Sequence, residues 1–348
     1  MKILLIAYNW PGGTQEFCSR AFTKLGHQIE KLLTPRVWKP FLFYPRIFNQ
    51  IYRINRWYEK KYWQHFNKLI TECAKSFKPE LVFIINEAFV YPETLSFLRE
   101  RLKIPIAVWI ADNPFDSDRF KFLPVNLRYF THIFVGEPHW IPNIRMLAKT
   151  KVIEYLYGAY DEDIFKPVPV SSQQKMIFSA NVSYAGSAYG VKAEAMYRLA
   201  ILDGVADLGL KIWGWGGWNE CYRYFPNIEK AYQKKSLTLK EMNIMNQVSK
   251  IVLNISHPQC ISAFQQRTFE IPASGGFQIA DHRSEIDRVL PEFEIDQFST
   301  IEELRELIKY YLEHPEIREE KVKKIQSAIK EKHTYSHRMS FVIKTVFG

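Results

Sequence analysis

Cysteine is scarce in this sequence, and its few cysteines lie far apart. The 348 residues include four, Cys18, Cys73, Cys221 and Cys260, with no C-x-x-C pair among them. This spacing argues against a structural zinc site and against a disulfide framework. Because no export signal is evident either, we expect reduced thiols in a cytoplasmic protein.

Long hydrophobic runs are also missing. No window approaches the roughly 20 mostly apolar residues that a bilayer-spanning helix needs. The opening run, residues 1–7, is too short for a signal-peptide core, and the sequence Asn9-Trp-Pro-Gly-Gly13 interrupts it. With 47% apolar residues the chain can nevertheless bury a core, which excludes disorder. We therefore interpret residues 1–7 as a first buried strand.

Positive charge is in excess, and it is concentrated in the first half. The formal net charge is +10, of which residues 1–170 carry +8 and residues 171–348 carry +2. The two halves are therefore expected to meet different partners.

A basic, aromatic stretch at residues 36–68 accounts for much of this charge, and Glu59 is its one acidic residue. Such interleaving suits single-stranded nucleic acid, a membrane interface or an anionic acceptor. A helix at about 55–75 with core aromatics and a solvated basic face is the alternative. Zinc-finger and RNA-recognition motifs are absent, so we expect no nucleic acid. Our hypothesis is that the stretch belongs to the acceptor side and contacts an anionic membrane.

Strand-like and helix-like segments alternate along the chain, which favours parallel sheets covered by helices. Residues 158–175 are polar and contain two prolines, and they separate two such alternations. A helical tail follows, at 302–312, 316–332 and 336–346. The predicted strands are 3–8, 26–33, 81–85, 106–111, 133–135 and 152–157, then 176–180, 211–213, 251–255 and 276–280. The sequence therefore predicts an α/β protein of two Rossmann-like domains.

The segment 266–276 has the clearest chemical pattern. Arg267 precedes Glu270 by three residues, which places both side chains on one helical face. Ser274, Gly275 and Gly276 follow, and glycines let backbone N–H groups approach an anion closely. Together these residues could hold a ribose diol and a diphosphate. An ordinary surface ion pair beside a glycine turn is the alternative.

The pattern Arg267-x-Phe-Glu270-x-x-Ala-x-Gly275-Gly276, followed by Asp281, 300–304 and 333–338, resembles the C-terminal half of CgeB-like (spore-maturation) glycosyltransferases of the GT-B superfamily. The resemblance is good over 176–345 and weaker over 80–166. It implies a GT-B fold and a nucleotide-diphosphate sugar as co-substrate. It assigns Glu270 to the donor ribose, Arg267 to the diphosphate, and Ser274 to Gly276 to a phosphate-facing turn.

Two further segments extend the resemblance. The run Tyr184-Ala-Gly186-Ser-Ala-Tyr-Gly-Val-Lys192 is similar to the family's glycine loop, with Lys192 where the family usually has an arginine. A lysine keeps the charge but lacks the bidentate fork. Trp213, Gly214 and Trp215 match the family's glycine–tryptophan turn, which implies a wall around the nucleotide base. A tight turn with packed aromatics is the alternative.

The resemblance implies chemistry without a metal, in which helix N-termini and basic side chains stabilise the departing diphosphate. We expect such helix ends after Ser274–Gly276 and after Gly186. A third follows Gly12 and Gly13 on the acceptor side, with Glu16 beside it. The D-x-D sequence 161–163 lies in the linker, so we expect no metal there. Asp112, Asp116 and Asp118 lack the glycine and the closing glutamate of a calcium loop.

A catalytic base is expected at the carboxyl end of a strand in the first domain, if the reaction inverts the anomeric configuration. Asp112 is the first candidate, Glu87 and Glu137 come next, and Glu16 is last. An Asx turn or helix cap ahead of Pro114 is the alternative for Asp112. A retaining reaction needs no such base.

We therefore expect a glycosyltransferase whose two domains face each other across a cleft. Residues 1–165 form an acceptor domain, 166–335 a donor domain, and 336–348 a tail helix that packs back on the first. The acceptor is a glycan, lipid or protein that the sequence does not identify. A sugar-nucleotide epimerase and a non-catalytic nucleotide-sugar-binding or coat-assembly protein remain alternatives.

Overall fold

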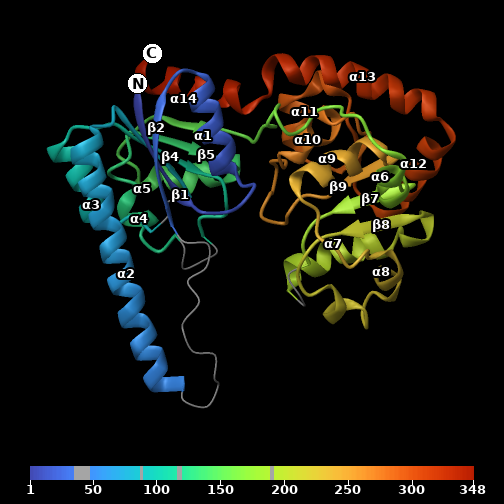
Figure 1. Cartoon of the computed structure of the whole chain (residues 1–348), viewed down its shortest axis with the longest axis horizontal. Helices are drawn as coiled ribbons and strands as arrows, with labels where there is room; N and C mark the ends of the chain where they lie inside the picture. Colours follow the sequence, from blue (N-terminus) through green and yellow to red (C-terminus); the bar gives the residue numbers. More distant parts are fainter. Residues whose placement is uncertain (35–47, 87–88, 116–119, 189–191) are drawn as a thin grey trace. The chain divides into compact units, whose positions relative to one another are not determined.

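The computed structural model describes residues 1–34, 48–86, 89–115, 120–188 and 192–348 (Figure 1). Contacts within the chain define two compact units. Unit 1 comprises Met1–Leu156 together with Arg338–Gly348, and unit 2 comprises Tyr157–His337. Each unit is built around a parallel sheet with helices packed along it.

Unit 1 contains a six-stranded sheet in the order β2-β1-β3-β4-β5-β6, and every strand pair in it is parallel. Continuous apolar runs produce the central strands, because both faces of such a sheet are covered. All five residues of β3 are buried, and so are all five of β4. The strands are β1 (Lys2–Tyr8), β2 (Gln28–Thr34), β3 (Leu81–Ile85), β4 (Ile106–Ile110), β5 (His132–Val135) and β6 (Ile153–Tyr155).

The helices of unit 1 bury apolar side chains against this sheet. Trp63, Phe66 and Ile70 of the long helix α2 join the same core cluster as alternate residues of β1, β3 and β4. Each such side chain stabilises the fold by about 1.5–3 kcal/mol when fully buried. The helices are α1 (Thr14–Lys24), α2 (Phe48–Phe77), α3 (Pro92–Ser96), α4 (Leu123–Asn126) and α5 (Ile141–Leu147).

Unit 2 contains a five-stranded parallel sheet in the order β11-β10-β9-β7-β8. Its strands are β7 (Val182–Ala185), β8 (Leu210–Trp213), β9 (Ile251–Asn254), β10 (Gln278–Asp281) and β11 (Asp296–Phe298). Its helices are α6 (Ser172–Phe178), α7 (Ala193–Asp203), α8 (Pro226–Ala231), α9 (Leu239–Val248), α10 (Arg267–Ala273), α11 (Ser284–Val289), α12 (Ile301–Glu313) and α13 (Pro315–Lys332).

The strand predicted at 176–180 is wrong, because these residues belong mainly to helix α6. Ser171 and Gln174 form a capping box at its start, in which each side chain accepts the other residue's backbone N–H. The apolar side chains that suggested a buried strand are partly exposed: Met176 is 75% exposed and Ile177 43%. The first strand of unit 2 is β7 instead.

The tail is helical, as predicted. Helices α12 and α13 cover the predicted segments, and α14 (Tyr335–Phe347) ends the chain. From Arg338 onward α14 belongs to unit 1, where the ring of Phe341 lies 6.2 Å from that of Phe134.

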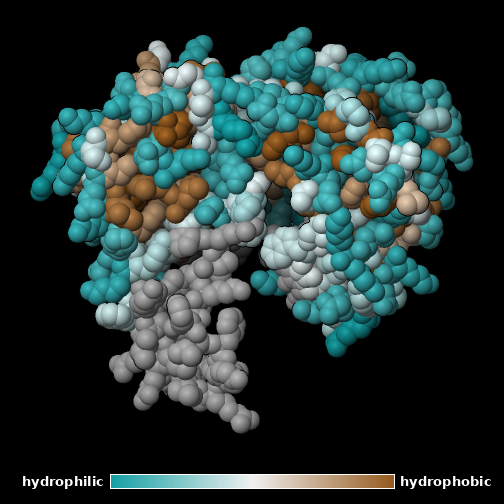
Figure 2. All heavy atoms as spheres, viewed as in Figure 1, coloured by the Kyte–Doolittle hydropathy of each residue, from teal (hydrophilic) through white to brown (hydrophobic). Residues whose placement is uncertain are grey.

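Hydrophilic side chains predominate on the face of the molecule seen in Figure 2, with smaller hydrophobic areas between them. Within the part of the chain that the structure describes, no helix combines the length and the apolar character needed to cross a membrane.

Candidate functional site

The carboxyl ends of β7 and β9 mark the natural binding edge of unit 2. All five strands are parallel, so their carboxyl ends lie at one edge of the sheet. Strand β8 lies beside β7 on one side, and the next strand along the chain, β9, lies beside β7 on the other side. Ligands of open α/β sheets bind in the crevice outside the strands at such a change of direction.

Helix α10 follows β9 and brings two charged side chains to this edge. Phe269 and Ala273 lie one turn apart and join Ile325 and Ile329 of α13 in one core cluster. Because this face is occupied by packing, Arg267 and Glu270 are presented on another. Both line a pocket, here called the Glu270 pocket.

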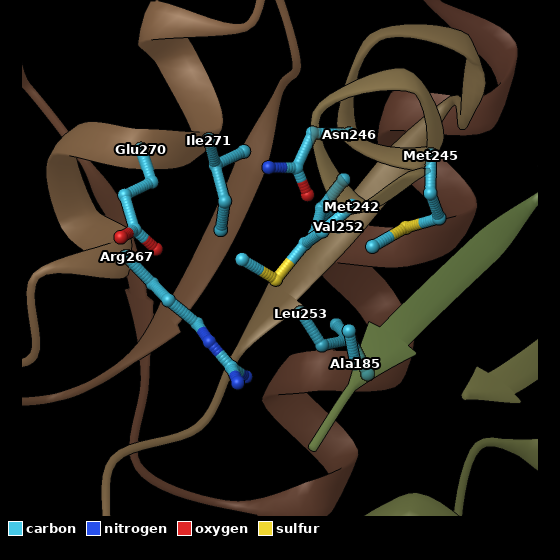
Figure 3. Close-up of a pocket in the computed structure, with 9 residues that line it drawn as sticks. All are labelled: Ala185, Met242, Met245, Asn246, Val252, Leu253, Arg267, Glu270 and Ile271. Carbon is cyan, nitrogen blue, oxygen red and sulfur yellow. The ribbon is translucent and has the colours of Figure 1, made fainter. Parts of the chain in front are cut away.

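The Glu270 pocket lies between α9, α10 and the ends of β7 and β9. In Figure 3 the side chain of Arg267 extends toward Leu253 and Ala185, while the carboxylate of Glu270 stays close to the helix. Its empty volume is about 220 Å³, part of which is open solvent. Its lining is Ala185, Met242, Met245, Asn246, Val252, Leu253, Arg267, Glu270 and Ile271.

Glu270 is buried without full hydrogen bonding. It is 1% exposed, and its Oε1 has no hydrogen-bond partner among the residues that the structure describes. Burial raises the pKa of this carboxyl from 4.5 to about 8; Arg267 opposes the shift, and Asp161 adds to it. A buried acceptor without a partner is costly, so a ligand hydroxyl that donates to Oε1 would be favoured.

The loops after β7 and β8 are joined to each other by backbone hydrogen bonds. The Gly186 N–H donates to Trp213 O at 2.8 Å, and the Ala188 N–H donates to Trp215 O at 3.1 Å. A Cβ on Gly214 would lie 1.4 Å from Gly186 O, so only glycine fits at 214. The close approach of the two loops is therefore enough to explain why residue 214 is a glycine, without any role in ligand binding.

The two tryptophans of the predicted base wall differ in exposure. Trp213 is 1% exposed and packs with Phe178 in a core cluster. The prediction that Trp213 lines the nucleotide base is therefore wrong, since the end of β8 points this side chain inward. Trp215 is 48% exposed, and its base-binding role stays a prediction.

The turn at Ser274, Gly275 and Gly276 ends a helix and does not begin one. Ser274 is the C-terminal cap residue of α10, Gly275 has a φ of 93°, and the Gly276 N–H donates to Ile271 O. This is a helix-terminating turn, and strand β10 follows it directly. The predicted helix N-terminus after Gly276 is therefore wrong. The turn presents the negative end of a helix dipole, which does not favour a phosphate.

Helix α7 begins after the glycine loop, as predicted. Lys192 is its N-terminal cap residue and is exposed. An eleven-residue helix with its N-terminus at this edge favours an anion. The contact of Lys192 and Gly186 with a diphosphate stays a prediction.

Sequence reasoning missed Arg198, the one cation of α7 that is buried. It is 8% exposed, and its guanidinium donates to Tyr184 Oη at 3.2 Å and to Ser187 O at 3.3 Å. Tyr184 lies in β7, and its ring also faces the guanidinium of Arg267 at 5.7 Å. No periodicity or motif distinguishes this arginine from a surface residue.

In unit 1, Asp112 follows β4 and is held by Asn86, which follows β3. The Asn86 Nδ2 donates to Asp112 Oδ2 at 2.9 Å, and Asn86 Oδ1 accepts the N–H groups of Ala111 and Asp112. Asn86 has a φ of 55°, an uncommon backbone conformation that costs about 1–3 kcal/mol. The carboxylate is thus oriented at the predicted sheet edge. Its role as a base stays a prediction, and Glu87 lies outside the described residues.

Helix α1 begins at Thr14, which confirms the helix start predicted after Gly12 and Gly13. Gly12 has a φ of 66°, and Gly13 is the N-terminal cap residue. Glu16 lies in the first turn and is half-buried. Contact of these residues with an acceptor stays a prediction.

The other charged segments add little to the site. The Asp161 Oδ1 accepts the Asp163 N–H at 3.0 Å, an Asx turn within the linker. Across the described ranges, no group of three or more histidine, cysteine or acidic side chains could hold a metal ion.

Asp116, Asp118 and most of 36–56 lie outside what the structure describes. Further along α2, Trp57 is 60% exposed, and Lys61 Nζ lies 6.0 Å from its ring centre.

Comparisons with known proteins identify the fold. Residues 197–344 match a family model described as glycosyl transferase-like. The chain is similar to sucrose-phosphate synthase from Thermosynechococcus elongatus, with 11% identity over 100% of this chain and 99% of the other and a TM-score of 0.68. It is also similar to Anabaena HepE in complex with UDP-glucose, at 11% identity, 99% of both chains and a TM-score of 0.62.

A third similar structure is a putative UDP-N-acetylglucosamine 2-epimerase from Listeria monocytogenes. It shares 9% identity over 98% of this chain and 94% of the other, with a TM-score of 0.59. No curated protein matches the sequence. The chain therefore has a GT-B fold of two Rossmann-like domains. The narrower resemblance to CgeB-like proteins stays a prediction.

Proposed function

We propose that this chain is a glycosyltransferase that moves a sugar from a nucleotide-diphosphate donor to an acceptor, with the donor bound by unit 2. One observation carries the proposal. At the carboxyl edge of the sheet, a 1%-exposed carboxylate with an unpartnered oxygen lies one helical turn from the half-exposed Arg267. The family match over residues 197–344 supports it, because this range contains α10.

The chemistry follows from the charges at this edge. When the bond between the sugar and the diphosphate breaks, positive charge develops at the anomeric carbon and negative charge on the leaving group. Glu270 would accept hydrogen bonds from the ribose hydroxyls, and Arg267 and Lys192 would stabilise the diphosphate. Preorganised donors at the site of developing charge are usually the largest single contribution to catalysis.

The epimerase remains the second candidate, because a GT-B structure named as a putative UDP-N-acetylglucosamine 2-epimerase is similar over 98% of this chain. Product analysis separates the two. A transferase forms a new glycoside only when an acceptor is present, whereas an epimerase alters the nucleotide sugar in its absence. A non-catalytic binding protein would leave the nucleotide sugar unchanged in both assays.

On the acceptor side we propose Gly12, Gly13, Glu16 and Asp112 of unit 1. We also propose that the basic stretch 36–68 contacts an anionic membrane. Flotation of liposomes with and without acidic lipid tests this contact, and binding that does not depend on salt or acidic lipid would contradict it.

The donor is tested with a thermal-shift panel of UDP, GDP, dTDP and CDP compounds. A ligand at 100 times its Kd adds about 2.7 kcal/mol to the stability of the folded state, which a melting curve resolves. We expect one nucleotide to raise the melting temperature more than the others. No shift with any of them, even at millimolar concentration, would count against the proposal.

Replacing Glu270 by alanine is expected to weaken nucleotide binding by about 1–3 kcal/mol, because the ribose hydroxyls lose the carboxylate that accepts their hydrogen bonds. Titration calorimetry with the nucleotide found in the panel measures the loss. The control is Glu285→Ala, which removes another buried carboxylate of unit 2, one that pairs with Arg288. Equal affinities of the Glu270→Ala variant and the unaltered chain would refute the assignment.

Chelation of divalent metals is expected to leave transfer unchanged. The diphosphate is proposed to be stabilised by Arg267, Lys192 and the start of α7, so no divalent ion is needed. Turnover is compared after dialysis against EDTA and after adding back Mg²⁺ or Mn²⁺. A loss of activity on dialysis that either metal restores would show that this account of the leaving group is wrong.

A further inference from the structure

Arg198 is a buried cation whose hydrogen bonds go to neutral oxygen atoms, Tyr184 Oη and Ser187 O. It forms no ion pair with any carboxylate whose side chain the structure describes, and the side chain of Glu194, four residues earlier in α7, lies outside that description. Burying a charge without a counter-charge costs several kcal/mol. The arginine is therefore expected to have a role that offsets this cost.

Another arginine at the same edge shows the usual solution. Arg283 follows β10, and its Nη2 lies 2.7 Å from the carboxylate of Asp281, which is itself buried. That guanidinium is neutralised within the protein. Arg283 thus provides a matched comparison.

Arg267 adds a second guanidinium to the same tyrosine. Its Cζ lies 5.7 Å from the centre of the Tyr184 ring, while Arg198 donates to the hydroxyl of that ring. Like Arg198, Arg267 forms no ion pair with any carboxylate whose side chain the structure describes. Tyr184 is 1% exposed, so its position is fixed by packing. One buried side chain thus contacts two cations near the end of β7.

Glu270, the nearest carboxyl to Arg267 on α10, does not neutralise this pair. Burial raises its pKa to about 8, so in the empty site it is mostly protonated near neutral pH. Lys192, at the start of α7, adds positive charge. The end of β7 therefore carries two guanidinium charges, and no carboxylate among the described side chains forms an ion pair with either of them.

We propose that Arg198, Tyr184 and Arg267 form an anion-binding site at the end of β7, whose counter-charge is the diphosphate of the bound nucleotide. This inference rests on the proposed function and extends it to residues that no motif indicated. Arg267 is half-exposed and contacts the anion. Arg198 is a positioning residue: it fixes Tyr184 and the Ser187 carbonyl, and its charge favours an anion next to Arg267.

The test measures how affinity depends on the phosphates. Three probes are titrated into the full chain at neutral pH: inorganic pyrophosphate, the nucleoside diphosphate selected by the panel, and the corresponding nucleoside. In Arg198→Met we expect about 10-fold weaker binding of both phosphate-containing probes, because a nearby positive charge is lost and Tyr184 is no longer held by its hydrogen bond. Affinity for the nucleoside should change less than 2-fold.

Two further variants separate charge from folding. Arg198→Lys should recover part of the pyrophosphate affinity, because it restores the charge without the bidentate geometry. Arg283→Met removes a partly buried arginine that has its own carboxylate, so it should not discriminate between the nucleoside and the diphosphate. If Arg198→Met does not fold, Tyr184→Phe takes its place, and pyrophosphate affinity should still fall.

The outcomes distinguish this inference from the function on which it rests. If the unaltered chain binds a nucleoside diphosphate, and Arg198→Met or Tyr184→Phe binds it and pyrophosphate equally well, the inference is overturned and the proposed function stands. If the chain binds no nucleoside diphosphate, the proposed function fails. Arg198-dependent binding of pyrophosphate alone would still support an anion site.

Discussion

The protein is expected to lose stability as the pH rises from about 4.5 to about 8, and replacing Glu270 by glutamine is expected to remove most of this loss. The carboxyl has a pKa of about 8 in the folded protein and 4.5 as its ordinary value, with burial as the main cause. Between these values the folded state keeps a proton that the unfolded state releases. The free energy of unfolding therefore falls as the pH rises through this window.

The expected size is on the order of 4 kcal/mol across the window, because each pKa unit corresponds to about 1.4 kcal/mol. Glutamine cannot ionise, so its variant should lose much less stability over the same range. Denaturant unfolding at pH 5 and pH 8.5, for both proteins, measures the difference. Glu285→Gln is the control for changing a buried carboxylate. If the free energy of unfolding depends on pH in the same way in the unaltered chain and in Glu270→Gln, the carboxyl of Glu270 is ionised throughout this range and the prediction is wrong.

Replacing Asp112 by asparagine is expected to lower the rate of sugar transfer by about 100-fold or more, since a general base contributes about 10²–10⁴-fold. Donor affinity should stay unchanged, because Asp112 belongs to unit 1 and the proposed donor residues to unit 2. The substitution keeps the shape of the side chain beside Asn86. Turnover is measured with an acceptor that the unaltered chain glycosylates, and donor binding by calorimetry.

Two results would contradict this role for Asp112. One is turnover in Asp112→Asn close to that of the unaltered chain. The other is a product that retains the anomeric configuration of the donor, seen by NMR, since retention requires no such base. Glu93→Gln is the control, because Glu93 is another carboxylate of unit 1, exposed in the first turn of α3, for which no role is proposed.

The parallel sheets were predictable because their cause is local. Apolar runs such as Leu81–Ile85 can be buried on both faces only inside a covered sheet, and the structure buries every residue of that run. The run at 176–180 is similarly apolar and predicts a strand, but its residues belong mainly to helix α6. The Ser171-x-x-Gln174 capping box was the signal for a helix, and it was present in the sequence.

The candidate site was predictable in part. The spacing of Arg267 and Glu270 placed them on one helix, and both line the same pocket. The role of Ser274–Gly276 was misjudged, because glycines occur at both ends of helices, although more often at the C-terminal end. Helix α10 ends at Ala273 and strand β10 begins at Gln278, so the turn terminates the helix.

Arg198 shows what sequence patterns cannot provide. Whether an arginine is solvated or buried depends on the loop that folds over it, and whether it is paired depends on side chains distant in sequence. Its acceptors Tyr184 and Ser187 are 14 and 11 residues away. Burial and pairing are properties of the tertiary structure, so this residue was found only there.

The bonding between the loops after β7 and β8 limits how this protein could change its choice of donor. Adding or deleting a residue between Gly186 and Ala188, or between Trp213 and Trp215, would break one of these two hydrogen bonds and leave backbone groups of both segments without partners. The lengths of these two segments are therefore constrained together. Divergence in the preferred nucleotide is expected through exchange of exposed side chains such as Trp215, on a main chain of constant length.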